Sequence, residues 1–375
     1  MTDKRKMSNI EGFLMEGGSK VIQVIKSKSW IIVFVLIVIL STGGLVLFST
    51  AEEKQEPCFY KSLHYTGEGM RYWYEENGGF MEITGVPYEE LDCKKCHVKS
   101  CEPCHAKTED GKCSYSLDKA KDMNTCLACH SREKVTFKIG REKDALDIHI
   151  ASGMGCVDCH TGEDVHGDGT IYHTMRDEGA VKASCKTCHS LEDVDIRAHK
   201  VHKEKLDCAA CHVANTTSCL NCHFSKFLET GKRAGNFFPP IQDWLILVNY
   251  KGKVTSGNVQ TLVYEDKKFI TYAPYFTHAV QSKARGCTDC HANEAVMLIK
   301  EGKSVPMAEF KDNKMVSWKG VVPLVPDQLE WEFVDKDGDK WVPLKNDVKP
   351  MVQYSCYAEP LTEEQVKKMA MPFKK

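Results

Sequence analysis

The 375-residue sequence predicts a mainly α-helical and irregular fold, with a smaller C-terminal segment that contains β-hairpins and one N-terminal transmembrane helix. Three observations support this: residues 30–48 are uncharged, a cysteine motif recurs between residues 93 and 291, and strand-like alternation begins only after residue 240. The expected organisation is a basic segment at 1–29, a membrane span at 30–50, an aromatic-rich lead-in at 51–92, a motif-rich domain at 93–230 and a β-containing segment at 231–375.

The uncharged stretch at 30–48 is nearly as long as the roughly 20 residues with which a helix crosses a bilayer. Lysines and an arginine precede it and glutamates follow it, so the positive-inside rule keeps the N-terminus in the cytoplasm. The alternatives are a signal peptide cleaved after Ala51 and a buried core helix, which the absence of charge on any face disfavours. The expected location is a membrane-anchored protein whose remaining chain faces the periplasm or the extracellular side.

The repeated motif is Cys-x-x-Cys-His, and it takes up sixteen of the 19 cysteines. Its cysteine pairs are Cys93 and Cys96, Cys101 and Cys104, Cys126 and Cys129, Cys156 and Cys159, Cys185 and Cys188, Cys208 and Cys211, Cys219 and Cys222, and Cys287 and Cys290. The histidines that complete the motifs are His97, His105, His130, His160, His189, His212, His223 and His291.

This motif predicts covalent haem attachment, because two thiols one helical turn apart can form thioethers to one porphyrin while the adjacent imidazole binds its iron. Tetrahedral zinc is the alternative reading of Cys-x-x-Cys pairs, but it gives no reason for a histidine after every second cysteine. We therefore expect eight haem c groups. Seven motifs within 93–223 leave too little chain for separate protein cores, so the haems should pack against one another.

Outside the motifs the sequence has seven histidines, which are candidate distal iron ligands: His64, His149, His166, His173, His199, His202 and His278. His199 and His202 have helical i, i+3 spacing, although each could serve a different haem. His149, His202 and His278 shortly precede a motif and could fold back over a haem, whereas the glycine-rich surroundings of His166 predict a loop.

Two axial imidazoles saturate a haem iron and favour electron transfer, whereas an open sixth position allows substrate binding. Seven candidates for eight irons leave one iron unmatched; its sixth ligand could be Lys, Met, a thiolate, water or a histidine of another chain. Cys58, Cys113 and Cys356 lie outside the motifs. A disulfide between Cys58 and Cys113 is the plain interpretation, with haem ligation as the alternative.

The motifs and extra histidines within 93–291 resemble the multihaem c-type cytochromes of anaerobic respiration, and their number resembles the octahaem group, which includes tetrathionate reductase-like and hydroxylamine oxidoreductase-like enzymes. The resemblance implies an electron conduit that exchanges electrons with redox proteins or a quinone-linked membrane donor, with no nucleic-acid partner. It leaves two alternatives: a reductase or oxidase of tetrathionate, hydroxylamine or nitrite at one haem without two histidines, and a surface filament or other homo-oligomer. The Cys-x-x-Cys-Lys motif of cytochrome-type nitrite reductases is absent from the sequence. No catalytic residue is assigned.

The remaining sequence predicts three local features. Aromatic residues at 60–74 could pack on a haem face or in an ordinary core. Alternating residues within 240–350 predict hairpins around the last motif. The acidic run at 335–339 predicts a hairpin turn rather than calcium binding, because its glycine is not at the position that an EF-hand loop requires.

Overall fold

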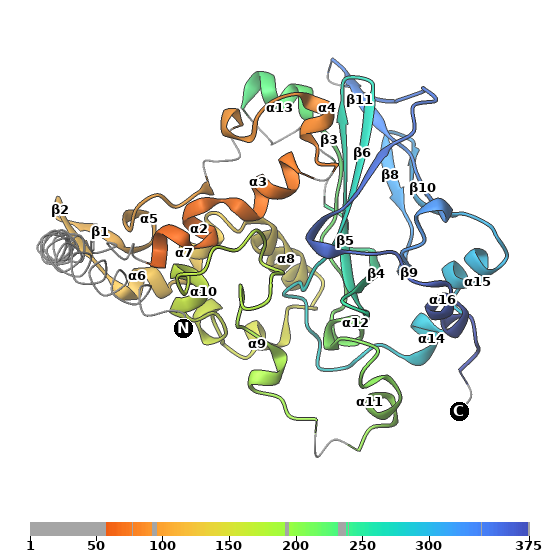
Figure 1. Ribbon diagram of the computed structural model, residues 1–375, viewed down its shortest axis with the longest axis horizontal. Helices are drawn as coiled ribbons and strands as arrows, with labels where there is room; N and C mark the ends of the chain where they lie inside the picture. Colours follow the sequence, from red (N-terminus) through yellow and green to blue (C-terminus); the bar gives the residue numbers. More distant parts are fainter. Residues whose placement is uncertain are drawn as a thin grey trace, which may run out of the picture. The chain divides into compact units, whose positions relative to one another are not determined.

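Short helices dominate the first part of the described chain and β-strands the second (Figure 1). The computed structural model describes residues 58–373 except 77, 92–95, 192–194, 232–237, 239 and 339. The helical elements of the first part are η1 (Cys58–Lys61), α2 (Leu63–Thr66), α3 (Glu68–Glu75), α4 (Met81–Thr84), η2 (Tyr88–Glu90), α5 (Glu102–His105), α6 (Leu117–Lys121), α7 (Met123–Leu127), α8 (Ser131–Glu142), α9 (Ile148–Ala151), η4 (Cys156–Asp158), α10 (Gly162–His166), η5 (Cys185–Thr187), α11 (Arg197–His202) and α12 (Cys208–His212). A small antiparallel hairpin of β1 (Ala106–Glu109) and β2 (Lys112–Tyr115) lies among them.

The second part is built around a mixed six-stranded sheet. Its strands are β3 (Cys219–His223), β4 (Trp244–Tyr250), β5 (Lys253–Tyr264), β6 (Lys267–Pro274), β9 (Gly320–Pro323) and β13 (Met351–Tyr354). Strands β7 (Val305–Lys311), β8 (Lys314–Ser317) and β10 (Leu329–Trp331) form a second sheet, and β11 (Val334–Asp337) pairs with β12 (Lys340–Pro343). The remaining helical elements are α13 (Phe224–Thr230), α14 (Cys287–Cys290), α15 (Glu294–Lys300), η6 (Pro326–Gln328), η7 (Ser355–Tyr357) and α16 (Glu363–Met369).

The prediction of a mainly α-helical fold is therefore wrong. The predicted hairpins β4–β5, β5–β6 and β11–β12 are present, but parallel pairings of β13 with β6, β9 with β4 and β3 with β5 extend them into a large sheet. Hairpins can be read from neighbouring residues, whereas these parallel pairings join strands far apart in the sequence. The sequence pattern consequently underestimated the β structure.

Strand β5 organises the large sheet because both of its edges are paired. One edge pairs with β6 along Gly257–Tyr264, while the other pairs first with β4 and then, from Gln260 onward, with β3. Gly257 is required here, because an added Cβ would lie 2.4 Å from the Val248 side chain on β4. The two-residue turn Lys251–Gly252 has positive φ at both positions, which matches the twist of the strands that it joins.

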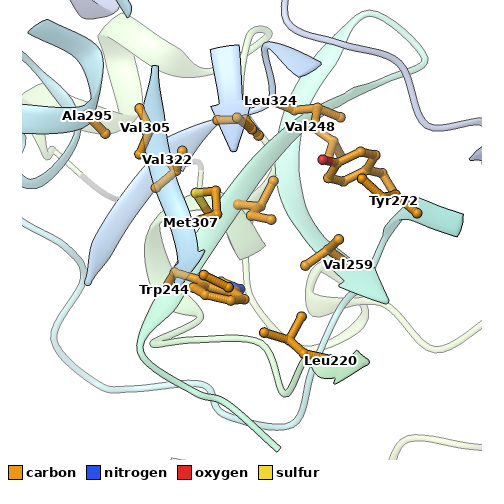
Figure 2. Close-up of a cluster of buried hydrophobic side chains, with 14 of the residues drawn as sticks. Leu220, Trp244, Val248, Val259, Tyr272, Ala295, Val305, Met307, Val322 and Leu324 are labelled. Carbon is orange, nitrogen blue, oxygen red and sulfur yellow. The ribbon is translucent and has the colours of Figure 1, made fainter. Parts of the chain in front are cut away.

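The main hydrophobic core lies between the two sheets and α15 (Figure 2). All residues of β4 except its last are buried, so its continuous apolar sequence reflects burial on both faces. Trp244, Val259, Tyr272 and Met307 are at most 1% exposed. This part of the chain thus has a conventional protein core.

A second apolar cluster attaches the N-terminal helices to the sheet. Phe80, Tyr88 and Leu91 from the lead-in pack with Phe224 and Phe227 of α13 and with Phe269 of β6. Of the predicted aromatic group at 60–74, Tyr74 joins this cluster. The cluster brings the segment that precedes the first motif next to the strand that carries the seventh.

The predicted membrane anchor at 30–50 lies outside the described residues. Within the described part of the chain, no helix has the length and apolar character needed to cross a bilayer. The membrane-anchored location that was expected from the sequence is therefore not supported.

Candidate haem-binding site

Of the seven Cys-x-x-Cys-His motifs that the structure describes in full, six fold as a single helical turn. In five of them the backbone N–H of the histidine donates to the backbone carbonyl oxygen of the first cysteine, at 2.8–3.0 Å. The histidines concerned are His105, His130, His160, His189 and His291, and the sixth motif forms α12 (Cys208–His212). This turn is the local geometry in which both thiols and the imidazole can reach one porphyrin.

The motif at Cys219–His223 is a β-strand instead. Cys219 and Cys222 pair with Gln260 and Leu262, which lie two residues apart on β5, so a bulge puts both thiols on one face of the strand. His223 pairs with the next residue of β5 and lies on the opposite face. It is nearly buried and contacts the Asp335 carboxylate through Nδ1. These residues do not fit a porphyrin in the way that the six helical motifs do.

Of the first motif, the structure describes only Cys96 and His97. The His97 ring stacks on Tyr88 with centroids 5.6 Å apart, and its Nε2 atom is 2.9 Å from the Tyr88 hydroxyl. The ring also lies against Gly67, where an added Cβ would be 2.0 Å from it. His97 therefore faces a tyrosine rather than a second histidine.

Each of the six helical motifs presents its histidine to a histidine from outside the motifs. The pairs are His105 with His166, His130 with His64, His160 with His278, His189 with His149, His212 with His199, and His291 with His202. Their ring centroids are 6.1 or 6.2 Å apart in every case, whereas the other aromatic contacts of the described chain range from 4.4 to 6.4 Å.

This common separation fits a metal ion between two imidazoles. A metal–imidazole bond is about 2.0–2.1 Å long and the ring centre lies about 1.2 Å further on, so opposed ligands have centroids about 6 to 6.5 Å apart. Ordinary ring contacts have no reason to converge on one value within that window. Both the type of ligand, two imidazoles, and the separation of the rings therefore fit a haem iron with two axial histidines.

The pairs are formed across long stretches of sequence. His149, His202 and His278 each shortly precede a motif, but each faces the histidine of a different motif. His199 and His202 do share one helix, α11, and face different motifs. His166 ends the helix α10 rather than lying in a loop.

His173 is the remaining distal candidate, and it does not face a motif histidine in the structure. Its ring packs on Tyr72 with centroids 5.0 Å apart, and its Nδ1 atom is 3.8 Å from the Glu68 carboxylate. Two motif histidines, His97 and His223, are thus left without an opposing histidine among the described residues.

Hydrogen bonds on Nδ1 orient several of the paired rings. Carboxylates accept from three of them: Asp147 from His149 at 3.3 Å, Asp164 from His160 at 3.2 Å and Glu133 from His278 at 2.9 Å. Backbone carbonyls accept from His202 at 3.0 Å and from His291 at 3.2 Å. This arrangement leaves Nε2 for a metal, and second-shell acceptors of this kind are usual for metal-binding histidines.

Sequence reasoning missed the three carboxylates. Their side chains are only 3–12% exposed, while the imidazoles that they hold are 36–45% exposed. Burial raises the pKa of Glu133, but the hydrogen bonds and charge of His278 and the hydrogen bond from Tyr275 together outweigh it, so the pKa lies below its ordinary value. Asp147 and Asp164 lie within four residues of their histidines and could have been suspected; Glu133 is 145 residues from His278 and could not.

Neighbouring thiols place the motifs in a spatial order that differs from the sequence order. Thiols of different motifs interact with one another: Cys96 with Cys129, Cys126 with Cys156, and Cys185 with Cys208. Electrostatic interactions connect further thiols: Cys159 with Cys188, Cys211 with Cys287 and Cys290, and Cys104 with Cys126. The motifs therefore follow one another as His291, His212, His189, His160, His130 and His97, with the His105 motif beside His130.

The chain around these motifs has almost no core of its own. Between residues 101 and 200 the buried described residues are Thr136, Phe137, Gly140, Asp147, Thr174 and Ala180. Large apolar side chains are left exposed in the same region, including Leu117 at 68% and Ile171 at 57%. A protein segment of this length needs buried apolar surface to hold a defined conformation, and several porphyrins would supply it.

The cysteines outside the motifs are not joined to each other. Cys58 and Cys113 are free and exposed, so the predicted disulfide between them is not formed. Cys356 accepts a hydrogen bond from the Thr174 hydroxyl at 3.3 Å. In the described part of the chain no three His, Cys, Asp or Glu side chains converge as they would around a single metal ion.

Comparisons with known proteins give no relative to reason from. No protein-family model, curated protein or solved structure matches the chain. The resemblance to octahaem cytochromes therefore remains an expectation from the motifs.

Proposed function

We propose that the protein conducts electrons through a chain of closely packed haem c groups. The observation that carries this proposal is the set of six histidine pairs, each with one motif histidine and one histidine from elsewhere, at a common separation of 6.1–6.2 Å. Bound haem would supply one-electron redox chemistry at each pair.

The residues of the chain have three roles in this proposal. The motif cysteines would attach each porphyrin covalently, and the two imidazoles of a pair would bind its iron, a ligand set that favours electron transfer over substrate binding. Contacts between thiols of successive motifs bring the attachment points close together, from the His291 motif to the His97 motif. Haems attached so close to one another would favour electron transfer from one site to the next.

The pairing is tested by removing single distal histidines from the haem-loaded full-length protein. His64→Ala, His166→Ala and His199→Ala should each convert one low-spin ferric haem to a high-spin or weakly ligated one, as seen by electron paramagnetic resonance. His173→Ala is the matched control and should leave the low-spin signals unchanged. A protein without covalently bound haem, or an equal effect of all four substitutions, would contradict the proposal.

Reduction of a small nitrogen or sulfur compound is a second candidate function. It is favoured by His97 and His223, which lack an opposing histidine among the described residues. A high-spin ferric signal that nitrite, hydroxylamine or tetrathionate perturbs would support it. Haems that are all low-spin and inert to these compounds would remove it.

A further inference from the structure

The His160–His278 pair differs from the other pairs in the charge around its imidazoles. Both of its rings donate Nδ1–H to a carboxylate, Asp164 at 3.2 Å and Glu133 at 2.9 Å. Among the other pairs in the described part of the chain, only His149 has a carboxylate on Nδ1, and its partner His189 has none. Two of the remaining rings use backbone carbonyls, which carry no net charge.

The two carboxylates of this pair are fixed and shielded from solvent. Glu133, on α8, is 12% exposed and also contacts the Tyr275 hydroxyl, while Asp164, on α10, is 4% exposed and accepts from the Lys182 backbone N–H at 2.7 Å. Buried charges act at a lower effective dielectric than exposed ones, so their influence on a neighbouring site is stronger.

We propose that the His160–His278 pair holds the haem of lowest reduction potential in the chain. This inference rests on the proposed function. A carboxylate on Nδ1 makes the imidazole a stronger electron donor to the iron, and a nearby buried negative charge favours the more positive, ferric state. Both effects would act here through both imidazoles of the pair.

The position of this site gives the difference a functional meaning. The thiol contacts place the His160 motif between those of His130 and His189, in the interior of the chain. An electron that travels the whole chain must therefore pass an unfavourable step at this site. Glu133 and Asp164 act as positioning and tuning residues, and they would control the rate of end-to-end transfer.

The test compares potentials in the haem-loaded full-length protein by a redox titration followed with electron paramagnetic resonance. Glu133→Gln keeps an acceptor for His278 but removes the negative charge. It should raise the reduction potential of the lowest-potential haem by at least 59 mV, which corresponds to a tenfold change in the equilibrium constant for one-electron reduction. Glu142→Gln is the control, because it removes the same charge from an exposed position on the same helix. It should leave that component unchanged.

Two further variants keep the inference open to refutation if Glu133→Gln does not fold. Asp164→Asn should shift the same component upward, and Tyr275→Phe should shift it downward, because the carboxylate loses a competing hydrogen-bond donor. An unmoved lowest component in the charge-removing variants, or an equal shift in Glu142→Gln, would overturn this inference alone. Absence of low-spin haem in the unmodified protein would overturn the proposed function as well.

Discussion

At the scale of single residues, the histidines outside the motifs carry most of the information about function. The sequence marked seven of them as candidate ligands, and six face a motif histidine in the structure. Their partners could not be predicted, since an axial pair needs two rings that are close in space and not in sequence. His173 shows that the number of histidines alone does not identify each of them as a ligand, because His173 does not face a motif histidine.

The helix α11 allows a sharp residue-scale prediction. His199 and His202 lie one turn apart but face His212 and His291. His199→Ala and His202→Ala should therefore remove two different low-spin components, and the double variant should lose both. The measurement is electron paramagnetic resonance of the three variants. Loss of the same component in both single variants would contradict the assignment.

At the scale of elements, the strand β3 shows how tertiary contacts override a local motif. Asn221 within the motif has a φ of 49° and is 1% exposed. Its side chain accepts from the Val334 N–H at 3.3 Å and donates to the Glu332 carbonyl at 3.4 Å. These bonds fix the bulge of β3 against the start of β11, so this motif is held as a strand while six others form a helical turn.

Substitution of Asn221 should destabilise the sheet. Asn221→Ala leaves buried backbone groups unpaired and puts alanine in a left-handed conformation, so we expect a loss of about 2–4 kcal/mol in the free energy of unfolding. Asn313→Ala is the control, because Asn313 has a φ of 60° in the turn between β7 and β8 and should cost about 1 kcal/mol. Urea unfolding followed by circular dichroism makes the comparison, and equal losses would argue against the role of the Asn221 side chain.

Elements made by neighbouring residues were predictable, and those made by distant ones were not. The hairpin β11–β12 follows from the acidic turn and the alternation on either side of it, and it was predicted. The parallel edge strands β9 and β13 are four residues long, and their pairing partners lie far away in the sequence. Such strands depend on the surface offered by a sheet that is already formed, which is why the α-helical content was overestimated.

At the scale of the whole molecule, two parts of one compact unit are stabilised differently. The sheets enclose an apolar core around Trp244 and Met307, whereas residues 101–200 bury few side chains. The sheets are stabilised by their own side chains. In our proposal residues 101–200 are stabilised by cofactors, which would take the place of a core.

Haem-free protein should show this difference directly. Serine in place of the motif cysteines prevents covalent attachment, and backbone amides of 101–200 should then exchange rapidly with solvent while those of β4 and β5 stay protected. Hydrogen exchange followed by mass spectrometry measures both regions in one sample, with the haem-loaded protein as the control. Strong protection of 101–200 without haem would show that this region has a core independent of cofactors.

The sequence by itself determined the chemistry expected of this protein, because thioether attachment needs only five consecutive residues and these recur eight times. Only the tertiary structure decided which imidazoles face each other, which motifs depart from the helical turn and where buried carboxylates meet the paired histidines. The physical reason is that a covalent site is local to the chain, whereas an axial pair and its second shell form only where folding brings distant residues within a few ångströms.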